Sequence, residues 1–401
     1  MRLVHLSDLH LGFRQYQRLT PSGFNQREYD VSRTFHRAVD RIIGLRPELV
    51  LIAGDVFHNS RPTNAAILDA FRQFLRIRNE IPETRIVMIA GDHDTPRTTE
   101  SGNILGLFAQ IGVNVAANDS RAITIPELDT TVLAVPDIPG MPLPQLSLGA
   151  ADRRRFNLLL IHANVNEVVP QYYADLDRAT NSVSRGDLQL SQWDYVALGH
   201  YHVHRQVAPN AFYSGSLDYT SLNVWFDKDE EEELGLEGKG FIEYDLASKA
   251  MKYHALEASR EFLQLKPLNA RDMSPAEVDA AIKKAVEKVK DGIDDKVVRL
   301  VIRDIPRQVS RELDHRTLRE YKKRALSFIL DFRRPEITRR QTAGGPARRP
   351  SVADVVREQL TTRDIPTDLD RARLVELGMK YLDDAEVIQT TAAPAPAEAE
   401  Q

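Results

Sequence analysis

Five short apolar runs in the first half of the chain each end in an aspartate or a histidine. The runs are rich in Val, Ile and Leu and are bounded by polar residues or glycine, which is typical of buried strands. They span residues 3–6, 49–53, 86–90, 158–161 and 195–198. Apolar stripes with helical spacing lie between them, from Val31 to Ile42 and from Ile67 to Leu75. Alternation of strand and helix predicts a layered α/β domain.

The strands that follow lack long helices between them. Apolar runs at 212–213, 241–244 and 252–256 succeed one another at short intervals. We therefore expect a second, more antiparallel sheet in the same domain. The acidic run 229–233 between them is expected to be a solvated loop.

A separate module is predicted after residue 258. Strands at 262–265, 297–302 and 327–332 alternate with helices at 275–290 and 313–321, and Ser274 followed by Pro275 is a helix-start signal. The predicted domains are 1–258 and a compact βαβαβ module at 259–333. Beyond them we expect a basic linker rich in Arg, Gly and Pro at 334–350, a helical segment at 351–390 and a disordered tail at 391–401.

The polar residues at the ends of the five runs form the candidate site. They occur in the motifs SDLH, GDVFH, GDHD, a single histidine, and GHYH: Asp8, His10, Asp55, His58, Asp92, His93, His162, His200 and His202. A lone histidine or Gly-Asp pair is usually structural. However, six of the 11 histidines lie at these strand ends, where ligands of α/β sheets gather. The joint occurrence predicts a convergent cluster, while the other histidines are interpreted as structural.

The residue types indicate metal chemistry. Cysteine is absent, which excludes disulfides, thiolate metal sites and a cysteine nucleophile. Carboxylate and imidazole ligands suit Mn, Fe or Zn. Seven such ligands with one shared carboxylate can hold two ions, which activate water and clamp the oxygens of a phosphoryl transfer. His58 and His93, beside the ligands, are candidates for orienting the phosphate and protonating the leaving alkoxide.

The ordered set of motifs resembles the calcineurin-like metallophosphoesterases. Within that superfamily the chain is similar to the Mre11/SbcD-type DNA double-strand-break repair nucleases. Three features carry this narrower resemblance: HLSDLHLGFRQY with NQREYD downstream, the histidine that ends GDVFH, and SGSLDYTSL followed by KGFIEYDL. The resemblance implies an α/β fold, a four-layer sandwich of two mixed sheets flanked by helices, with a smaller α+β capping domain and C-terminal helices.

The resemblance also implies roles for the site residues. Asp8, His10 and His202 would bind one metal, Asp92, His162 and His200 the other, and Asp55 would bridge them. His58 and His93 would match the phosphate-orienting and acid residues. The family implies two Mn²⁺ ions, with Fe or Zn as other possibilities, and exonuclease or endonuclease activity on double-stranded DNA ends and single-stranded DNA. It further implies a homodimer through helices near 67–75 and 104–108, for which ordinary core packing is the alternative. It also implies an SMC-like ATPase partner of the SbcC/Rad50 type bound by the C-terminal helices, for which folding back on the cap is the alternative.

One position departs from the family pattern. The third motif is GNHD in the family and GDHD here, so Asp92 replaces an asparagine. Asp92 keeps an oxygen ligand, adds a negative charge and loses an NH₂ donor. We expect the site to bind metal but to react more slowly.

Local charge indicates where DNA would bind. The formal net charge of -5 excludes a protein that is basic overall, yet residues 299–349 hold 13 arginines and two lysines against six acidic residues. This stretch is either a phosphate-binding surface or a solvated helix face and linker. Arg14, Tyr16 and Arg18, together with Arg27, are further candidates for lining a DNA groove.

Two alternative functions remain open from the residues. One is a phosphoesterase for a small nucleotide or phosphoprotein, and the other is a DNA-end-binding scaffold with weak catalysis. The N-terminus lacks the basic and apolar regions of a signal peptide, and no apolar run approaches the ~20 residues of a membrane helix. We therefore expect no membrane partner and a cytoplasmic, nucleoid-associated protein.

Overall fold

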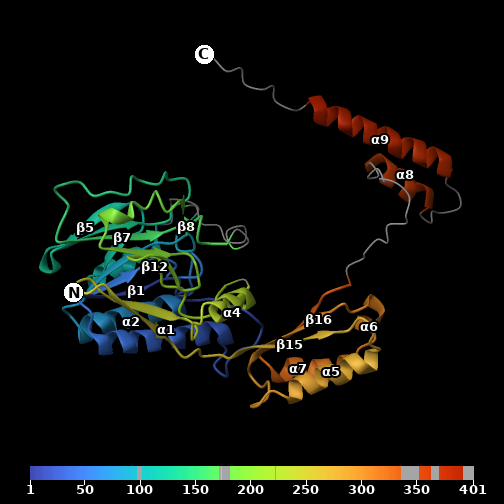
Figure 1. Cartoon of the computed structure of the whole chain (residues 1–401), viewed down its shortest axis with the longest axis horizontal. Helices are drawn as coiled ribbons and strands as arrows, with labels where there is room; N and C mark the ends of the chain where they lie inside the picture. Colours follow the sequence, from blue (N-terminus) through green and yellow to red (C-terminus); the bar gives the residue numbers. More distant parts are fainter. Residues whose placement is uncertain are drawn as a thin grey trace. The chain divides into compact units, whose positions relative to one another are not determined.

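The computed structural model describes residues 1–96, 102–170, 173, 181–221, 223–335, 352–362 and 370–391. These residues form two units, 1–335 and 336–401, which are described separately (Figure 1). Within the described residues, no helix is both long and apolar enough to cross a membrane.

The first sheet has six strands in the order β14-β13-β1-β2-β3-β4. Four strands are parallel: β1 (Arg2–Leu6), β2 (Leu49–Ile52), β3 (Arg85–Ile89) and β4 (Asn114–Ala116). β13 (Gly240–Asp245) runs antiparallel to β1, and β14 (Ala250–Ala255) runs antiparallel to β13. Helices α1 (Gln26–Leu45) and α2 (Asn64–Glu80) cover one face of this sheet (Figure 1). Phe35 and Phe74 lie in the apolar core between helices and sheet.

The second sheet has the order β11-β12-β10-β7-β6-β5. Its strands are β5 (Arg121–Ile125), β6 (Thr130–Val135), β7 (Phe156–His162), β10 (Tyr195–Gly199), β11 (Arg205–Ala208) and β12 (Ala211–Tyr213). Leu51 and Val87 of the first sheet share a buried cluster with Leu160 and Ala197 of the second. The two sheets therefore pack face to face, which brings the ends of β1, β2 and β3 toward those of β7 and β10.

Shorter elements connect these strands. They are η2 (Ile104–Ile111), η3 (Pro126–Leu128), β8 (Asn164–Val165), β9 (Ser182–Val183), η4 (Leu190–Gln192) and α4 (Val224–Glu233). The predicted fold class, α/β with two mixed sheets flanked by helices, is confirmed.

The predicted assignment of strands to sheets was wrong. β13 and β14 extend the first sheet, whereas β7 and β10 are the central, parallel strands of the second. Hydrophobic periodicity indicates whether a strand is buried but not which strand lies beside it, so it could not assign the strands to two sheets. The predicted loop at 229–233 was also wrong, because these residues belong to α4, and Glu231 is buried against Lys239.

The module after residue 258 has its own sheet and core. Its parallel strands β15 (Phe262–Asn269), β16 (Val297–Arg303) and β17 (Ser327–Phe332) alternate with α5 (Pro275–Glu287), α6 (Arg307–Arg311) and α7 (His315–Arg324). Ser274 and Glu277 form a capping box at the start of α5. Figure 1 shows α5 and α7 on one face of the sheet. The βαβαβ order is the one expected from the sequence.

Ion pairs join this module to the first sheet's helices. Arg260 binds Asp30 of α1 through Nε and Nη2, at 2.9 and 2.8 Å. Arg18 binds Asp295 at 2.9 Å and donates to the carbonyl oxygens of Lys323 and Ala325. Polar contacts therefore cross the junction at α1, at the C-terminal end of α7 and at Asp295 before β16.

The second unit contains α8 (Val352–Thr362) and α9 (Arg371–Thr391). The two helices pack closely, since a Cβ atom at Gly378 would overlap the side chain of Leu360. α9 extends beyond the helix predicted at 371–382. Most of the predicted linker, 336–350, and the tail at 392–401 lie outside the described residues.

Candidate metal centre

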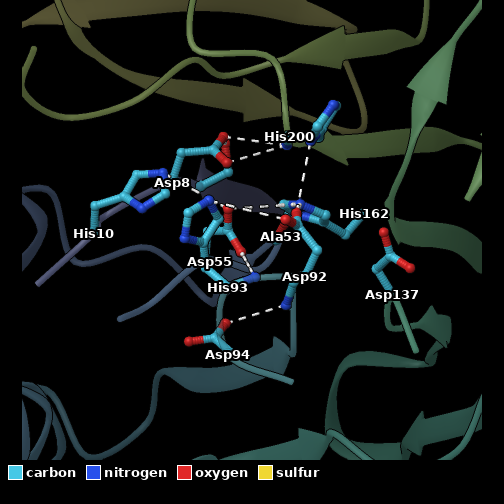
Figure 2. Close-up of polar contacts among 12 residues, drawn as sticks. Asp8, His10, Ala53, Asp55, Asp92, His93, Asp94, Asp137, His162 and His200 are labelled. Carbon is cyan, nitrogen blue, oxygen red and sulfur yellow. Dashed lines mark hydrogen bonds and ion pairs between the residues drawn. The ribbon is translucent and has the colours of Figure 1, made fainter. Parts of the chain in front are cut away.

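Turns at the ends of the strands hold the candidate ligands in an uncommon backbone conformation. Asp8, His10, Asp55 and His200 have φ angles of 53°, 44°, 53° and 101°. A positive φ is rare for residues other than glycine, and such residues cluster at functional sites. Figure 2 shows the side chains from these turns converging.

Glycines before the ligands let the turns approach one another. A Cβ atom at Gly91 would collide with the Asp55 carboxylate, and one at Gly199 would collide with the Ala53 carbonyl. The glycine in each of GDHD and GHYH is therefore a steric requirement of the site.

The first triad consists of Asp8, His10 and His202, which are all buried and offer ligand atoms within 4.8 Å of one another. The Nε2 atoms of His10 and His202 are 2.9 Å apart. Burial lowers the pKa of both imidazoles well below the ordinary value. They are therefore neutral, which is the form that binds metal. The hydroxyl of Ser7 and the backbone N–H of His200 donate to Asp8 and hold its carboxylate in place.

The second triad consists of Asp92, His162 and His200. Asp92 Oδ1 lies 3.1 Å from His162 Nε2 and 3.7 Å from His200 Nδ1. Nδ1 of His162 donates to the Ala53 carbonyl oxygen at 2.8 Å. This bond orients the ring so that Nε2 faces the carboxylates, as expected of a metal-binding histidine.

Asp55 lies between the two triads. Its Oδ2 atom is 3.6 Å from His10 Nε2 and 3.8 Å from His162 Nε2. Its Oδ1 atom accepts a hydrogen bond of 3.1 Å from the backbone N–H of His93. Burial, and next the charge of Asp92, raises the pKa of Asp55 well above the ordinary value. A carboxylate in this position is suited to bridge two cations.

The donor set fits divalent cations. Asp8 and Asp55 are buried and Asp92 is nearly so, which crowds three carboxylates into little volume. Among the described residues, His200 Nδ1 and Nε2 and His202 Nδ1 are buried without a hydrogen-bond partner. Buried unpaired polar atoms and crowded carboxylates are costly unless a further group satisfies them. Two cations would satisfy both.

His58 and His93 lie beside the triads and are half-buried. Their rings stack with centroids 5.1 Å apart, and His93 Nδ1 donates to the His58 carbonyl oxygen at 2.8 Å. The remaining nitrogen of His93, Nε2, is 3.9 Å from Asp92 Oδ2. Burial, and next the charge of His93, lowers the pKa of His58 to about 4. His58 is therefore neutral near pH 7.

The candidate DNA-contacting residues have partners within the protein. Arg14 pairs with Glu28 at 2.6 Å, and Arg18 binds the module after residue 258 as described above. Tyr16 packs against a buried apolar cluster that includes Tyr219 and Phe262. These contacts weaken the interpretation of Arg18 as a phosphate ligand. Part of the basic stretch, 336–349, lies outside the described residues.

Sequence reasoning missed two buried groups. Asp94 accepts hydrogen bonds from the backbone N–H groups of Val56, Phe57 and Gly91, so it joins the turns that carry Asp55 and Asp92. The final aspartate of GDHD was a signal that could have identified it. Lys239 contacts the backbone of His202 from a distant strand region, and no local pattern indicates this contact.

Comparisons with known proteins place the motifs of the site within a known family. The family model for calcineurin-like phosphoesterases matches residues 1–204, which contain all of the motifs from SDLH to GHYH. Three relatives share the name DNA double-strand break repair protein Mre11. The Methanococcus maripaludis protein is 27% identical over 62% of this chain and 63% of its own length. The Methanocaldococcus jannaschii protein is 24% identical over 66% of this chain and 69% of its own length. The Sulfolobus acidocaldarius protein is 28% identical over 49% of this chain and 51% of its own length.

The predicted resemblance is thus confirmed. The matched part of the chain spans between about half and two thirds of the length of these relatives.

Proposed function

The chain belongs to the calcineurin-like phosphoesterase family, and from this premise we propose that it is a two-metal-dependent DNA nuclease. The observation that carries the proposal is the pair of triads joined by Asp55. Such an arrangement suits hydrolysis of a phosphodiester, because both the attacking and the leaving oxygen need stabilisation.

Each triad would hold one divalent cation. Asp8, His10 and His202 form one set, Asp92, His162 and His200 the other, and Asp55 is shared. When bound, the cations lower the pKa of a coordinated water and neutralise charge on the phosphate. No serine or cysteine nucleophile is required.

His58 and His93 would act on the substrate directly. The neutral His58 ring can donate a hydrogen bond to a phosphate oxygen. His93 donates its Nδ1–H to the His58 carbonyl, so the imidazolium form, which also carries a proton on Nε2, would give that Nε2 proton to the leaving alkoxide. The half-buried position of both rings leaves them accessible to a substrate at the edge of the buried triads.

DNA is the proposed substrate class. The relatives described above are named as DNA double-strand break repair proteins. We propose that double-stranded ends and single-stranded DNA are processed in the cytoplasm at the nucleoid, with manganese as the metal and iron or zinc as other candidates. The parallel module at 259–333 would cap the nuclease domain at 1–258.

Assembly is proposed on two surfaces. Leu68 of α2 and Leu107 of η2 are exposed and would contribute to a homodimer. Leu377 and Tyr381 are exposed one turn apart on α9 and would contribute to binding of an SMC-like ATPase of the SbcC/Rad50 type. The basic linker at 334–350 would lie between the cap and this partner-binding segment.

A second candidate function is a DNA-end-binding scaffold with weak catalysis. Asp92 favours it, because its additional negative charge in the second triad would repel a phosphate oxygen. Hydrolysis of a small nucleotide is the other alternative, and a substrate panel distinguishes it.

The test combines metal binding with cleavage. We expect two Mn²⁺ per chain and cleavage of duplex and single-stranded DNA in preference to a bis-aryl phosphodiester. His93→Ala should keep both metals and lose ~10²–10⁴-fold in rate, as expected for a general acid. His36→Ala is the matched control, since His36 pairs with Asp69 on the surface of the α1–α2 layer. Absence of bound metal would overturn the proposal, and retained cleavage in His93→Ala would remove that residue from the mechanism.

A further inference from the structure

Lys239 is a buried cation that the proposed reaction does not use. Its side chain is 3% exposed and its Nζ atom lies 2.7 Å from Asp227 and 3.0 Å from Glu231. The third contact of Nζ is the carbonyl oxygen of His202, to which it donates at 2.8 Å. Of the three donors of the ammonium group, one therefore bonds Asp227 and one bonds His202, and Glu231 adds an ion pair.

The three charges are expensive to bury. Asp227 and Glu231 have exposed side-chain fractions of 0% and 5%. Replacement of buried ion triads by apolar residues is often neutral or stabilising, so such a triad is weak evidence for a stabilising role. The position of Lys239 suggests instead that it acts on the residue whose carbonyl it binds.

That residue, His202, belongs to the first triad. Its carbonyl oxygen also accepts from the backbone N–H of Ser216 at 3.0 Å. The hydroxyl of Ser216 donates to the same oxygen at 3.4 Å. Donors from two separate segments therefore hold the backbone of His202, while its Nε2 atom lies 2.9 Å from that of His10. Because the backbone and ring of one residue move together, the carbonyl contact limits where the ring can be.

Helix α4 supports the rest of the same turn. Asp227 and Glu231, which hold Lys239, are both on α4. The hydroxyl of Tyr201 hydrogen-bonds Glu230 of this helix. The hydroxyl of Tyr219 donates to Glu231 at 2.7 Å, and its ring centroid is 5.1 Å from Nζ of Lys239. One residue of the acidic run 229–233, Glu231, is thus buried and holds two interior side chains.

We propose that Lys239 is a positioning residue that places His202 for metal binding through its backbone carbonyl, with Asp227 and Glu231 placing Lys239 in turn. The inference rests on the proposed function, because it assumes that the first triad holds a cation. Groups outside the ligand set that orient a ligand typically contribute ~10–100-fold to metal affinity. The weakened site would be the one formed by Asp8, His10 and His202.

The decisive variant removes the positioning bond without leaving an unpaired charge. Lys239→Met alone leaves two buried carboxylates and could unfold the chain. The triple variant Asp227→Asn/Glu231→Gln/Lys239→Met is neutral throughout and retains similar volumes. Lys296→Met is the control, since Lys296 is 14% exposed and pairs with Glu261 in the module after residue 258.

The readout is Mn²⁺ binding to the full chain by calorimetric titration, with electron paramagnetic resonance to detect coupled Mn²⁺ pairs. In the triple variant we expect one of the two sites to weaken ~10–100-fold and the coupled signal to fall, with unfolding still cooperative. Lys296→Met should keep both sites. Two unchanged sites in a folded triple variant would overturn the inference and leave the proposed function intact. Failure of the wild-type chain to bind two ions would instead overturn the proposed function.

Discussion

Replacement of Asp92 by asparagine tests the charge balance of the metal centre. Asp92 Oδ1 lies 3.1 Å from His162 Nε2 and 3.7 Å from His200 Nδ1, so an asparagine oxygen in the same place would keep a metal ligand. Burial alone would raise the pKa of Asp92, but the hydrogen bond from His162 and the nearby ring of His200 hold it below the ordinary value. Asp92 is therefore an anion, and Asp92→Asn removes one negative charge.

The size of the effect follows from this charge. Two unit charges ~4 Å apart interact by ~4 kcal/mol at an effective dielectric constant of ~20. If solvent and the other carboxylates screen about two thirds of this energy, ~1.4 kcal/mol remains, which is a tenfold change in a binding constant. We expect Mn²⁺ affinity at the second triad to fall about tenfold or more in Asp92→Asn. Removal of the Asp92 charge also reduces repulsion of the anionic phosphodiester, so KM should fall and kcat should rise when metal is saturating.

The assay is a Mn²⁺ titration of both proteins followed by steady-state cleavage of duplex DNA at saturating Mn²⁺. Asp69→Asn is the control, because Asp69 is a partly buried carboxylate that bonds Ser32 and His36 and contacts none of the triads. Unchanged metal affinity together with unchanged KM and kcat in Asp92→Asn would refute the charge argument.

Three further predictions concern stability. Asp30→Asn should lower the free energy of unfolding in urea by ~3–5 kcal/mol, since it disrupts a buried carboxylate that binds Arg260 and leaves cationic charge unpaired; a loss below ~1 kcal/mol would contradict this. Burial, and next the charge of Glu233, raises the pKa of Glu230 from 4.5 to about 7. The folded chain therefore binds the Glu230 proton more tightly than the unfolded chain does. The stability that this proton contributes is lost as pH rises from 4.5 toward 7. Glu230→Gln should therefore flatten the dependence of Tm on pH between about 4.5 and about 7, and an unchanged slope would exclude Glu230 as its source. Chelation of Mn²⁺ should lower Tm, because metal at ~100 times its Kd stabilises the folded state by ~2.7 kcal/mol; identical Tm values with and without Mn²⁺ would count against binding.

Local pattern was sufficient for the strands and for the residues that end them. Apolar runs bounded by polar residues predicted β1, β2, β3, β7 and β10, because burial of a parallel strand is visible in its own side chains. Candidate ligands follow β1 (Asp8 and His10) and β10 (His200 and His202) at once. This position predicted that they meet at one edge of the fold. The elements of the module after residue 258 were predicted equally well, because its βαβαβ order alternates the hydrophobic periodicity of strands with that of helices.

Contacts between distant segments could not be predicted from the sequence. Arg18 remains a predicted DNA contact, and no local pattern indicated that it bonds Asp295 and the backbone carbonyls of Lys323 and Ala325. The acidic run 229–233 matched the composition of a solvated loop, yet Glu231 is buried because Lys239 lies beside it. A charged side chain is stable in the interior only with a partner, and that partner can be anywhere in the sequence.

The sequence alone therefore determined the ligand chemistry: aspartate and histidine without cysteine, placed at the ends of buried strands and preceded by glycines that permit close turns. Tertiary structure decided how these residues combine. Packing of the two sheets brings His10 within 2.9 Å of His202 and sets Asp55 between the triads. The physical reason is that a strand's burial is recorded in its own residues, whereas the partner of a buried polar group is fixed only when separate elements pack together.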